Sequence, residues 1–220
     1  MQQSEHFEAV VTKQVQLNYL LHIPPKQPGV DKYPLIVFLH GHGESGADLE
    51  QVKVHGIARI VEEQPDFPFI TVSPQCPSGV TWVLIDDAVI ALVEQMLKRP
   101  DVDASRVYLT GLSMGGFGTW HIGVGRPDLF AALAPICGGG SFVNYLPARI
   151  PRLKNTPVWA FHGADDDIVP LEEQEPLVEA LKAVSETEVK FTVYPGVKHD
   201  SWTQTYANPE LYDWFLKWHK

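Results

Sequence analysis

Six short runs of apolar residues, rich in Val, Ile and Phe, recur along the chain with helix-like stretches between them. The runs are 35–39, 69–73, 106–110, 131–136, 158–161 and 189–194. A strand that is covered on both faces is apolar at every position, whereas a strand with one exposed face alternates. The regular exchange of such runs with helical stretches therefore predicts a three-layer, doubly wound α/β domain with a mostly parallel sheet.

The two ends of the chain complete this domain. Phe7–Thr12 and Val15–Ile23 are β-type runs separated by a short turn, and we expect them to form an N-terminal antiparallel hairpin. Near the other end, spacing of i, i+3, i+4 and i+7 predicts a final helix with one buried stripe, formed by Leu211, Trp214, Phe215 and Trp218. No linker interrupts the pattern, so residues 1–220 are predicted to form a single domain.

Charge and cysteine content exclude several kinds of partner. The net charge of −10 repels phosphate groups, so we expect neither nucleic acid nor a membrane surface as a partner. Cys76 and Cys137 are too few for a four-cysteine zinc site. We expect free thiols in a reducing compartment, with one bridge as the alternative. The polar start of the sequence favours a cytoplasmic protein, but a secreted protein whose signal peptide has been removed has the same appearance.

The segment Gly111–Gly115 reads G-L-S-M-G and matches the pattern G-x-S-x-G. It follows the predicted strand 106–110 directly and precedes a helical stretch, 116–123, which is the setting of a serine on a tight strand–turn–helix corner. Neighbouring backbone approaches such a corner so closely that only glycine fits two positions before and two after the serine. The pattern predicts Ser113 as a nucleophile and directs the N–H of Met114 toward a developing negative charge.

A serine hydroxyl needs a general base, and the order of the elements selects among the nine histidines. Loops at the carboxyl ends of parallel strands gather at one edge of the sheet. The base should therefore follow the last strand and precede the last helix, which is the place of His199. The acid that orients this base should follow the strand 158–161. Asp165, Asp166 and Asp167 are adjacent there, and chemistry alone does not choose between them.

The loop 40–46 follows the first predicted parallel strand and reads H-G-H-G-E-S-G. Its glycines let a substrate carbonyl approach the backbone closely. We therefore predict that the backbone N–H of His42 is an oxyanion donor together with that of Met114. No metal site is predicted, because no further cluster of ligands accompanies His40 and His42.

Together these segments resemble the α/β-hydrolase superfamily, and most closely the small serine esterases of its phospholipase/carboxylesterase, polyhydroxybutyrate-depolymerase-like branch. The matching segments occur in the family's order; they are 40–46, 74–77 with Trp82, 111–116, 162–170 and 199–202. The resemblance implies a triad of Ser113, His199 and an acid, with no cofactor. The family pattern H-G-x-x-D-x-x-V-P places that acid at Asp166, with Asp165 and Asp167 as alternatives.

The resemblance also implies a function. It is the hydrolysis of small, short-acyl esters through an acyl-enzyme, with Trp82 lining the pocket or, alternatively, packing as a buried aromatic. The 20 residues Cys137–Thr156 are too few for a helical lid, so we expect an open site and no substantial cap domain. Ser113 argues against the dienelactone hydrolases, which have a cysteine nucleophile. The alternatives are a feruloyl or acetyl-xylan-type esterase, a prolyl-oligopeptidase-like peptidase, and a binding protein with a silent site.

Overall fold

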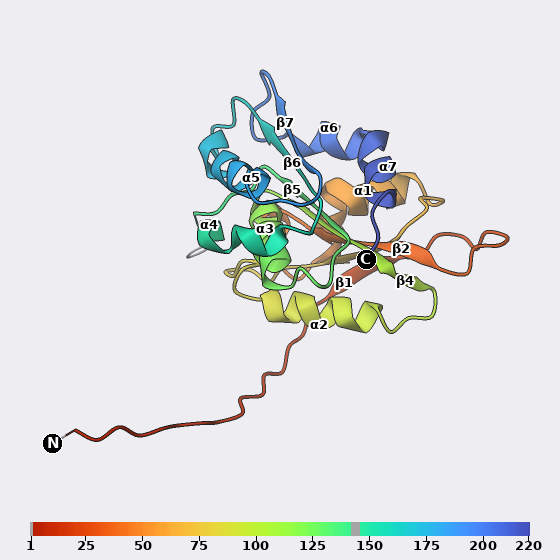
Figure 1. Ribbon diagram of the computed structural model, residues 1–220. Coiled ribbons are helices and arrows are strands. Elements are labelled where there is room, and N and C mark those ends of the chain that lie inside the picture. Colours follow the sequence, from red (N-terminus) through yellow and green to blue (C-terminus); the bar gives the residue numbers. More distant parts are fainter. Residues whose placement is uncertain (1, 142–145) are drawn as a thin grey trace.

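The computed structural model describes residues 2–141 and 146–220. Within these residues, seven strands form one sheet in the order β1-β3-β2-β4-β5-β6-β7, and every neighbouring pair except β1 and β3 is parallel (Figure 1). The strands are β1 (Tyr19–His22), β2 (Tyr33–Leu39), β3 (Ile70–Pro74), β4 (Val102–Leu112), β5 (Ala132–Ile136), β6 (Val158–Gly163) and β7 (Val189–Tyr194). The predicted mostly parallel α/β sheet is confirmed.

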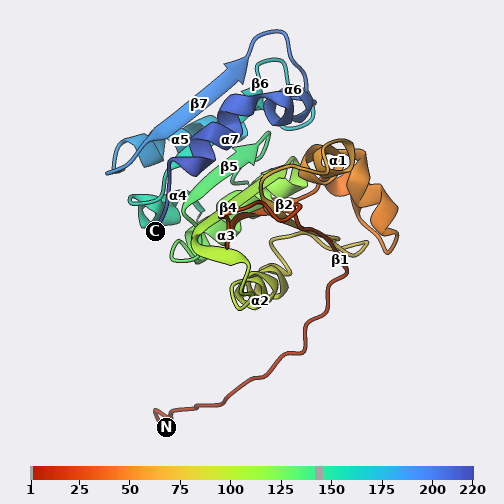
Figure 2. The same ribbon diagram turned by 90° about the vertical axis from the view of Figure 1, so that its right-hand side faces the viewer.

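Helices cover both faces of this sheet (Figure 2). One face carries α2 (Asp86–Met96), α3 (Met114–Gly125), α4 (Leu146–Arg149) and α5 (Glu175–Lys182), and the other carries α1 (Gly56–Glu63), α6 (Trp202–Ala207) and α7 (Pro209–Leu216). Four short 3₁₀ helices connect them in the described residues: η1 (His42–Glu44), η2 (Leu49–Val54), η3 (Ile150–Leu153) and η4 (Leu171–Glu173).

Two hydrophobic cores, one on each face, explain the continuous apolar runs. Successive side chains of a strand point to opposite faces. Leu35, Val37 and Leu39 accordingly pack in one core, whereas Ile36 and Phe38 pack in the other. All seven residues of β2 are buried. Each such aliphatic or aromatic side chain contributes about 1.5–3 kcal/mol by leaving water, so the central strands form a rigid base for the loops at their ends.

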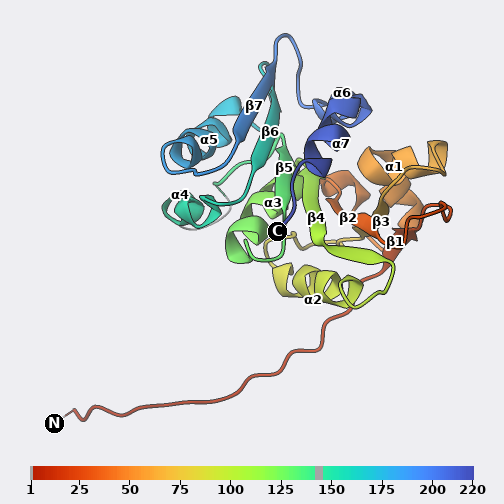
Figure 3. The ribbon, with the colours of Figure 1, turned by 45° about the vertical axis from the view of Figure 1, so that its right-hand side comes forward.

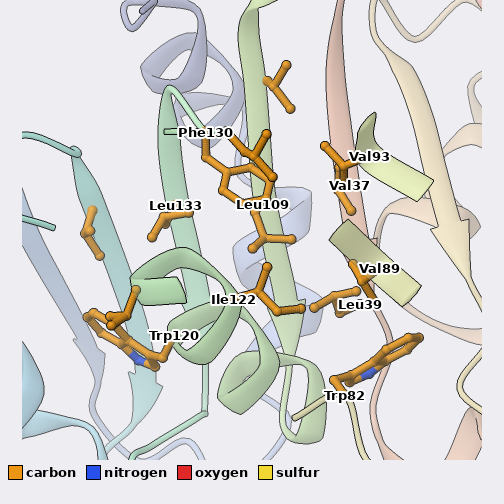
Figure 4. Close-up of a cluster of buried hydrophobic side chains, with 14 of the residues drawn as sticks. Val37, Leu39, Trp82, Val89, Val93, Leu109, Trp120, Ile122, Phe130 and Leu133 are labelled. Carbon is orange, nitrogen blue, oxygen red and sulfur yellow. The ribbon is translucent and has the colours of Figure 1, made fainter. Parts of the chain in front are cut away.

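Figure 4 shows the part of the first core that lies beneath the serine helix α3. Strand residues Val37, Leu109 and Leu133 meet Trp120 and Ile122 of α3 there. The indole of Trp82 closes the cluster beside Leu39, at the end of β2. This packing fixes α3, and with it the serine corner, against the middle of the sheet.

The N-terminal edge differs from the expectation. Residues 2–18 have no strand or helix. The trace of their first part leads away from the body of the domain (Figure 3), whereas Leu17 packs against the first core. Only the end of the run 15–23 forms a strand, β1, which pairs antiparallel with β3 from Tyr19 opposite Pro74 to His22 opposite Thr71. The predicted N-terminal antiparallel pairing is therefore confirmed, with β3 and not the segment 7–12 as the partner of β1. An isolated two-stranded hairpin is marginal in water, whereas pairing with β3 extends an existing sheet.

The segment between β5 and β6 contributes to the core. Leu146, Ile150 and Leu153, from α4 and η3, are fully buried in the first hydrophobic core. Residues 142–145, part of the segment expected to be too short for a lid, lie outside the described residues. In the described remainder, this segment packs against α3 and α5, as part of the domain itself.

The remaining expectations on the chain concern its cysteines and its last helix. Cys76 and Cys137 are both free and buried, so the alternative of a bridge between them does not hold. The predicted last helix is present as α7, with Leu211, Trp214 and Phe215 buried in the second core. The helix ends at Leu216, so Trp218 lies beyond it and packs, partly buried, against the same core. Among the residues that the structure describes, no helix combines the length and the apolar character needed to cross a bilayer.

Candidate active site

The site lies where the winding of the sheet reverses. From β2 the chain adds β3 on one side, and later β4 on the other side, followed by β5, β6 and β7. Loops that leave the carboxyl ends of the strands at such a point diverge and leave a crevice between them. Leu39, the last residue of β2, lies opposite Gly111 of β4. The loop 40–44 and the corner 111–115 therefore start side by side.

Ser113 occupies a strained corner between β4 and α3. Its backbone has φ 52° and ψ −116°, a combination that L-residues rarely adopt. A side chain at Gly111 would overlap the carbonyl group of Gly115, and one at Gly115 would overlap the carbonyl oxygen of Leu39. Both clashes are with backbone atoms, which cannot rotate away. The close backbone approach expected at these two glycines is therefore present. It places the corner directly against the end of β2.

Three side chains from distant parts of the chain form one hydrogen-bonded series. Nε2 of His199 lies 2.9 Å from Oγ of Ser113, and Nδ1 of His199 lies 2.8 Å from Oδ2 of Asp166. Since the carboxylate can only accept, Nδ1 carries the proton and Nε2 is free to accept the serine hydroxyl. This tautomer is the one that a general base for Ser113 requires.

The three adjacent aspartates have different surroundings. The side chain of Asp166 is fully buried, and its Oδ1 also accepts the backbone N–H groups of Ile168 and Val169. Asp165 and Asp167 are exposed. Lys198 donates a hydrogen bond to Asp167 at 2.8 Å, which lowers the pKa of that carboxyl group. The structure thus brings Asp166 to the imidazole and leaves both of its neighbours in solvent.

The loops that carry the acid and the base are joined at the ends of β6 and β7. A side chain at Gly163 would overlap the carbonyl oxygens of Val197 and Lys198, so glycine is needed for this close approach. The N–H of Asp165 donates to the carbonyl of Val197 at 2.9 Å. Burial lowers the pKa of His162, and its neutral ring contacts the carbonyl of Val169 at 2.8 Å. Together these contacts place the Asp166 loop beside the His199 loop.

The loop 40–44 lies directly against the serine corner. A Cβ at Gly41 would approach Cδ1 of Leu112 to 2.7 Å, so a larger residue here would require the leucine side chain to move. His42 is the first residue of η1 and Met114 the first residue of α3. The first N–H groups of a helix have no partner within it, so both are available as donors. The side chain of His42 is exposed.

Buried side chains support this loop from below. Nδ1 of His40 donates to the carbonyl of Gly41 at 2.6 Å, and Nε2 accepts the N–H of Cys76 at 2.9 Å. Burial lowers the pKa of His40 to about 4, so the ring is neutral, as this pattern requires. Trp82 is fully buried and donates its indole N–H to the carbonyl of His40 at 2.9 Å. Trp82 therefore lies under the loop, which favours its packing role over pocket lining.

Two residues without any role in the sequence analysis also lie here. The amide of Gln75 donates to the carbonyls of Glu44 and Asp48, at 2.9 and 2.8 Å, and so ties the loop to the end of β3. The ring of His55 lies edge-on to that of Trp202, with centroids 5.6 Å apart. His55 stands outside any motif, and only the fold brings it to the site.

One cluster in the described residues has the composition of a metal site. Ligand atoms of Cys137, Asp166 and His199 lie within 4.8 Å of one another. Burial raises the pKa of the Cys137 thiol to about 12, so the thiol is protonated at neutral pH. The thiolate is the form that binds metal, and the imidazole and the carboxylate are already engaged with each other. The donor set therefore does not suit an ion.

A doubly wound sheet with a serine on a glycine corner at its switch point is the architecture of the α/β hydrolases. Sequence comparison places the chain within that class. The model of the phospholipase/carboxylesterase family matches residues 67–209, and the chain belongs to this family.

Similar proteins include two curated enzymes and one solved structure. The chain is 28% identical to the bifunctional acetylxylan esterase/xylanase XynS20E of Neocallimastix patriciarum, over 82% of this chain and 26% of that protein. It is 31% identical to poly(3-hydroxyalkanoate) depolymerase C of Paucimonas lemoignei, over 64% of this chain and 37% of that protein. A crystal structure of a thermostable esterase superposes with a TM-score of 0.81 and 34% identity, covering 94% of this chain and 60% of that one. The chain thus spans less than two thirds of the length of each.

Proposed function

We propose that the protein hydrolyses small, short-acyl carboxylic esters through a covalent acyl-enzyme, with Ser113 as nucleophile, His199 as general base and acid, and Asp166 as the orienting carboxylate. The observation that carries this proposal is the hydrogen-bonded series from Ser113 Oγ through the imidazole to the buried carboxylate. Membership of an esterase family supports the reaction class.

The reaction proceeds in two halves. Oγ of Ser113 attacks the ester carbonyl carbon while Nε2 of His199 takes its proton, and the resulting oxyanion accepts the N–H groups of His42 and Met114. The tetrahedral intermediate collapses, and His199 returns the proton to the leaving alcohol oxygen. Water then attacks the acyl-serine by the same route and releases the carboxylic acid. Asp166 stays ionised and stabilises the imidazolium in both halves.

The proposed preference for short acyl groups rests on where the apolar side chains between β5 and β6 pack. In its described part, this segment buries Leu146, Ile150 and Leu153 in the core of the domain. These apolar side chains are therefore not available to cover a long acyl chain above Ser113. We expect kcat/KM for 4-nitrophenyl esters to fall steadily with acyl length beyond the shortest members of the series.

Replacement of the nucleophile tests the proposal. Ser113→Ala should lower the turnover of 4-nitrophenyl acetate by about 10⁴-fold or more, because the remaining groups of a triad cannot act without the nucleophile. The circular dichroism spectrum and the melting temperature should stay those of the wild type. The wild-type protein, but not the variant, should react with a fluorophosphonate probe. Substantial turnover by a folded Ser113→Ala variant would overturn the assignment.

A second candidate is an acetyl esterase that acts on a polysaccharide, which the acetylxylan esterase among the relatives favours. Both candidates use the same chemistry and differ in the alcohol. Release of acetate from acetylated xylan, compared with release from ethyl acetate, separates them. A peptidase is separated by the hydrolysis of a peptide amide, and a silent binding protein by the absence of fluorophosphonate labelling.

A further inference from the structure

A hollow of about 340 Å³ opens between α1 and the segment formed by α6 and the start of α7. We call it the α1–α6 groove, and it is lined by His55, Arg59, Phe67, Trp202, Ala207 and Tyr212, among others. At one end lie His55, which precedes α1, and Trp202, which begins α6. At the other end lie residues from the end of α1 and the beginning of α7.

The first end of the groove adjoins the catalytic groups. The ring of Trp202 meets that of His199 edge-on, with centroids 5.3 Å apart. The same ring also meets that of His55, with centroids 5.6 Å apart. Nε2 of His55 lies 4.0 Å from Oε1 of Glu44, which belongs to η1 together with His42. The groove thus begins between Trp202, which contacts His199, and the loop 40–44, which carries the proposed oxyanion donor His42.

The proposed reaction determines which half of an ester faces this end. His199 must reach the leaving oxygen to protonate it, so the alcohol lies on the side of the imidazole. From this we infer that the α1–α6 groove binds the alcohol half of the substrate, and that this alcohol carries a hydroxylated ring. The inference rests on the proposed ester hydrolysis and adds a binding site and a substrate class to it.

The lining of the groove accounts for the ring. Phe67, Trp202 and Tyr212 line it, and Phe67 lies edge-on to Tyr212 with ring centroids 5.0 Å apart. Aromatic side chains bind the face or the edge of another ring and are rigid, so little conformational entropy is lost on binding. The volume is near the lower end of the roughly 300–1,000 Å³ typical of ligand pockets, which suits one substituted ring rather than a polymer segment.

The rim of the groove accounts for the hydroxyl groups. Arg59 and Glu63 form an ion pair at 2.9 Å along the exposed side of α1. They offer charged donors and acceptors, which form stronger hydrogen bonds than neutral groups do. An aromatic lining with a polar rim binds a ring that has an apolar face and a hydroxylated edge. Phenols and sugars share this chemistry, and the experiment distinguishes these two sources.

The test varies the alcohol and keeps the acyl group constant. The substrates are ethyl acetate, 4-hydroxyphenyl acetate and a mono-O-acetylated methyl xyloside. The variant Ala207→Trp fills the groove from an exposed position at the end of α6. The matched control is Ala183→Trp, at an exposed position just after α5. Taking the ratio of variant to wild type for each substrate removes the different intrinsic reactivities of the three esters.

We expect Ala207→Trp to lower kcat/KM about tenfold or more for at least one ring ester, and less than about twofold for ethyl acetate. Filling the groove hinders only those substrates whose alcohol group enters it. A loss confined to the aryl ester identifies a phenolic alcohol, and a loss confined to the xyloside identifies a sugar. Equal losses for all three esters, or no loss for either ring ester, would overturn the inference.

A second variant keeps the test decisive if Ala207→Trp does not fold. Arg59→Ala removes an exposed side chain of the rim and should raise KM for the ring ester that binds, while kcat for ethyl acetate stays unchanged. An unchanged KM for both ring esters would contradict the groove assignment. Failure of the proposed function is a separate result, because it would appear as ethyl acetate hydrolysis that survives Ser113→Ala.

Discussion

The serine corner and the loops that face it are held in different ways, although their side chains meet in one hydrogen-bonded series. The corner is fixed by backbone against backbone, since Gly111 and Gly115 lie on carbonyl groups of the corner itself and of β2. The loops of Asp166 and His199 lie at the ends of β6 and β7 and are joined mainly to each other. The nucleophile is thus fixed against a central strand, whereas the acid and base lie on loops beyond the ends of β6 and β7.

The largest effect should come from the corner. In Gly115→Ala the added methyl group overlaps the carbonyl oxygen of Leu39. Leu39 ends β2, a central strand whose residues are all buried. We expect a loss of about 3 kcal/mol or more in the free energy of unfolding, measured by urea denaturation. Gly125→Ala, at the other end of α3, has nothing within 4 Å and serves as the control. Native stability in Gly115→Ala would contradict the described packing.

The next effect concerns the carboxylate. Asp166→Asn removes the charge that stabilises the imidazolium and should lower kcat about 10³–10⁴-fold, as loss of the triad acid does elsewhere. Asp167→Asn is the matched control, because that exposed side chain pairs only with Lys198 among the described residues. The kcat of Asp167→Asn should stay within about twofold of the wild type, because an exposed ion pair contributes little to the stability of the loop. A larger loss in Asp167→Asn would reverse the assignment of the acid.

A smaller effect should separate stability from activity. In Gly163→Ala the methyl group overlaps the carbonyl oxygens of Val197 and Lys198, in the loop that carries His199 and outside the central strands. Displacement of His199 by about 1 Å should lower kcat by roughly 10²-fold, while the melting temperature falls far less than in Gly115→Ala. If both glycine variants lost stability equally, the two regions would not differ as described.

The smallest effect is a dependence of stability on pH. Burial holds the pKa of His40 at about 4 in the folded protein, below the ordinary value of 6.5. Between these values the unfolded chain binds a proton that the folded chain does not bind. Stability should therefore fall as the pH decreases from 6.5 to 4, by up to about 1.4 kcal/mol per pH unit for one proton.

Urea unfolding at several pH values measures this slope. His40→Gln should reduce it, and the exposed His6→Gln should not. Part of the slope should remain in the His40 variant, because burial also lowers the pKa of His162. An identical slope in wild type and His40→Gln would show that His40 is not held neutral.

The difference between the two regions also explains what the sequence could predict. The corner is a local arrangement, so the spacing of Gly111, Ser113 and Gly115 was sufficient to predict it. His199 was predicted from the order of the elements alone. Asp166 followed only from the family pattern, because its burial depends on the N–H groups of Ile168 and Val169 and on the loop of β7, which no local spacing contains.

Features that depend on contacts between distant segments were beyond prediction. His55 belongs to no motif, and Gln75 lies in the matching segment 74–77 without a predicted role of its own. Each gains its role from a partner that the fold supplies, Trp202 and the carbonyl of Glu44. The first run of the expected hairpin, 7–12, has the composition of a strand but no strand partner in the described structure. Composition reports that a segment can be a strand, whereas the sheet edge decides which segment becomes one.

The backbone of Ser113 has one more consequence. Its dihedral angles cost on the order of 1–3 kcal/mol and persist only because the surrounding packing imposes them. A partly unfolded chain lacks this packing. We therefore expect Ser113 to lose its reactive backbone geometry when the cooperative tertiary structure is lost. During heating, the rate at which a fluorophosphonate labels Ser113 should therefore fall over the same temperature range as the near-ultraviolet circular dichroism signal of the buried tryptophans. Labelling of Ser113 would then measure the fraction of native protein.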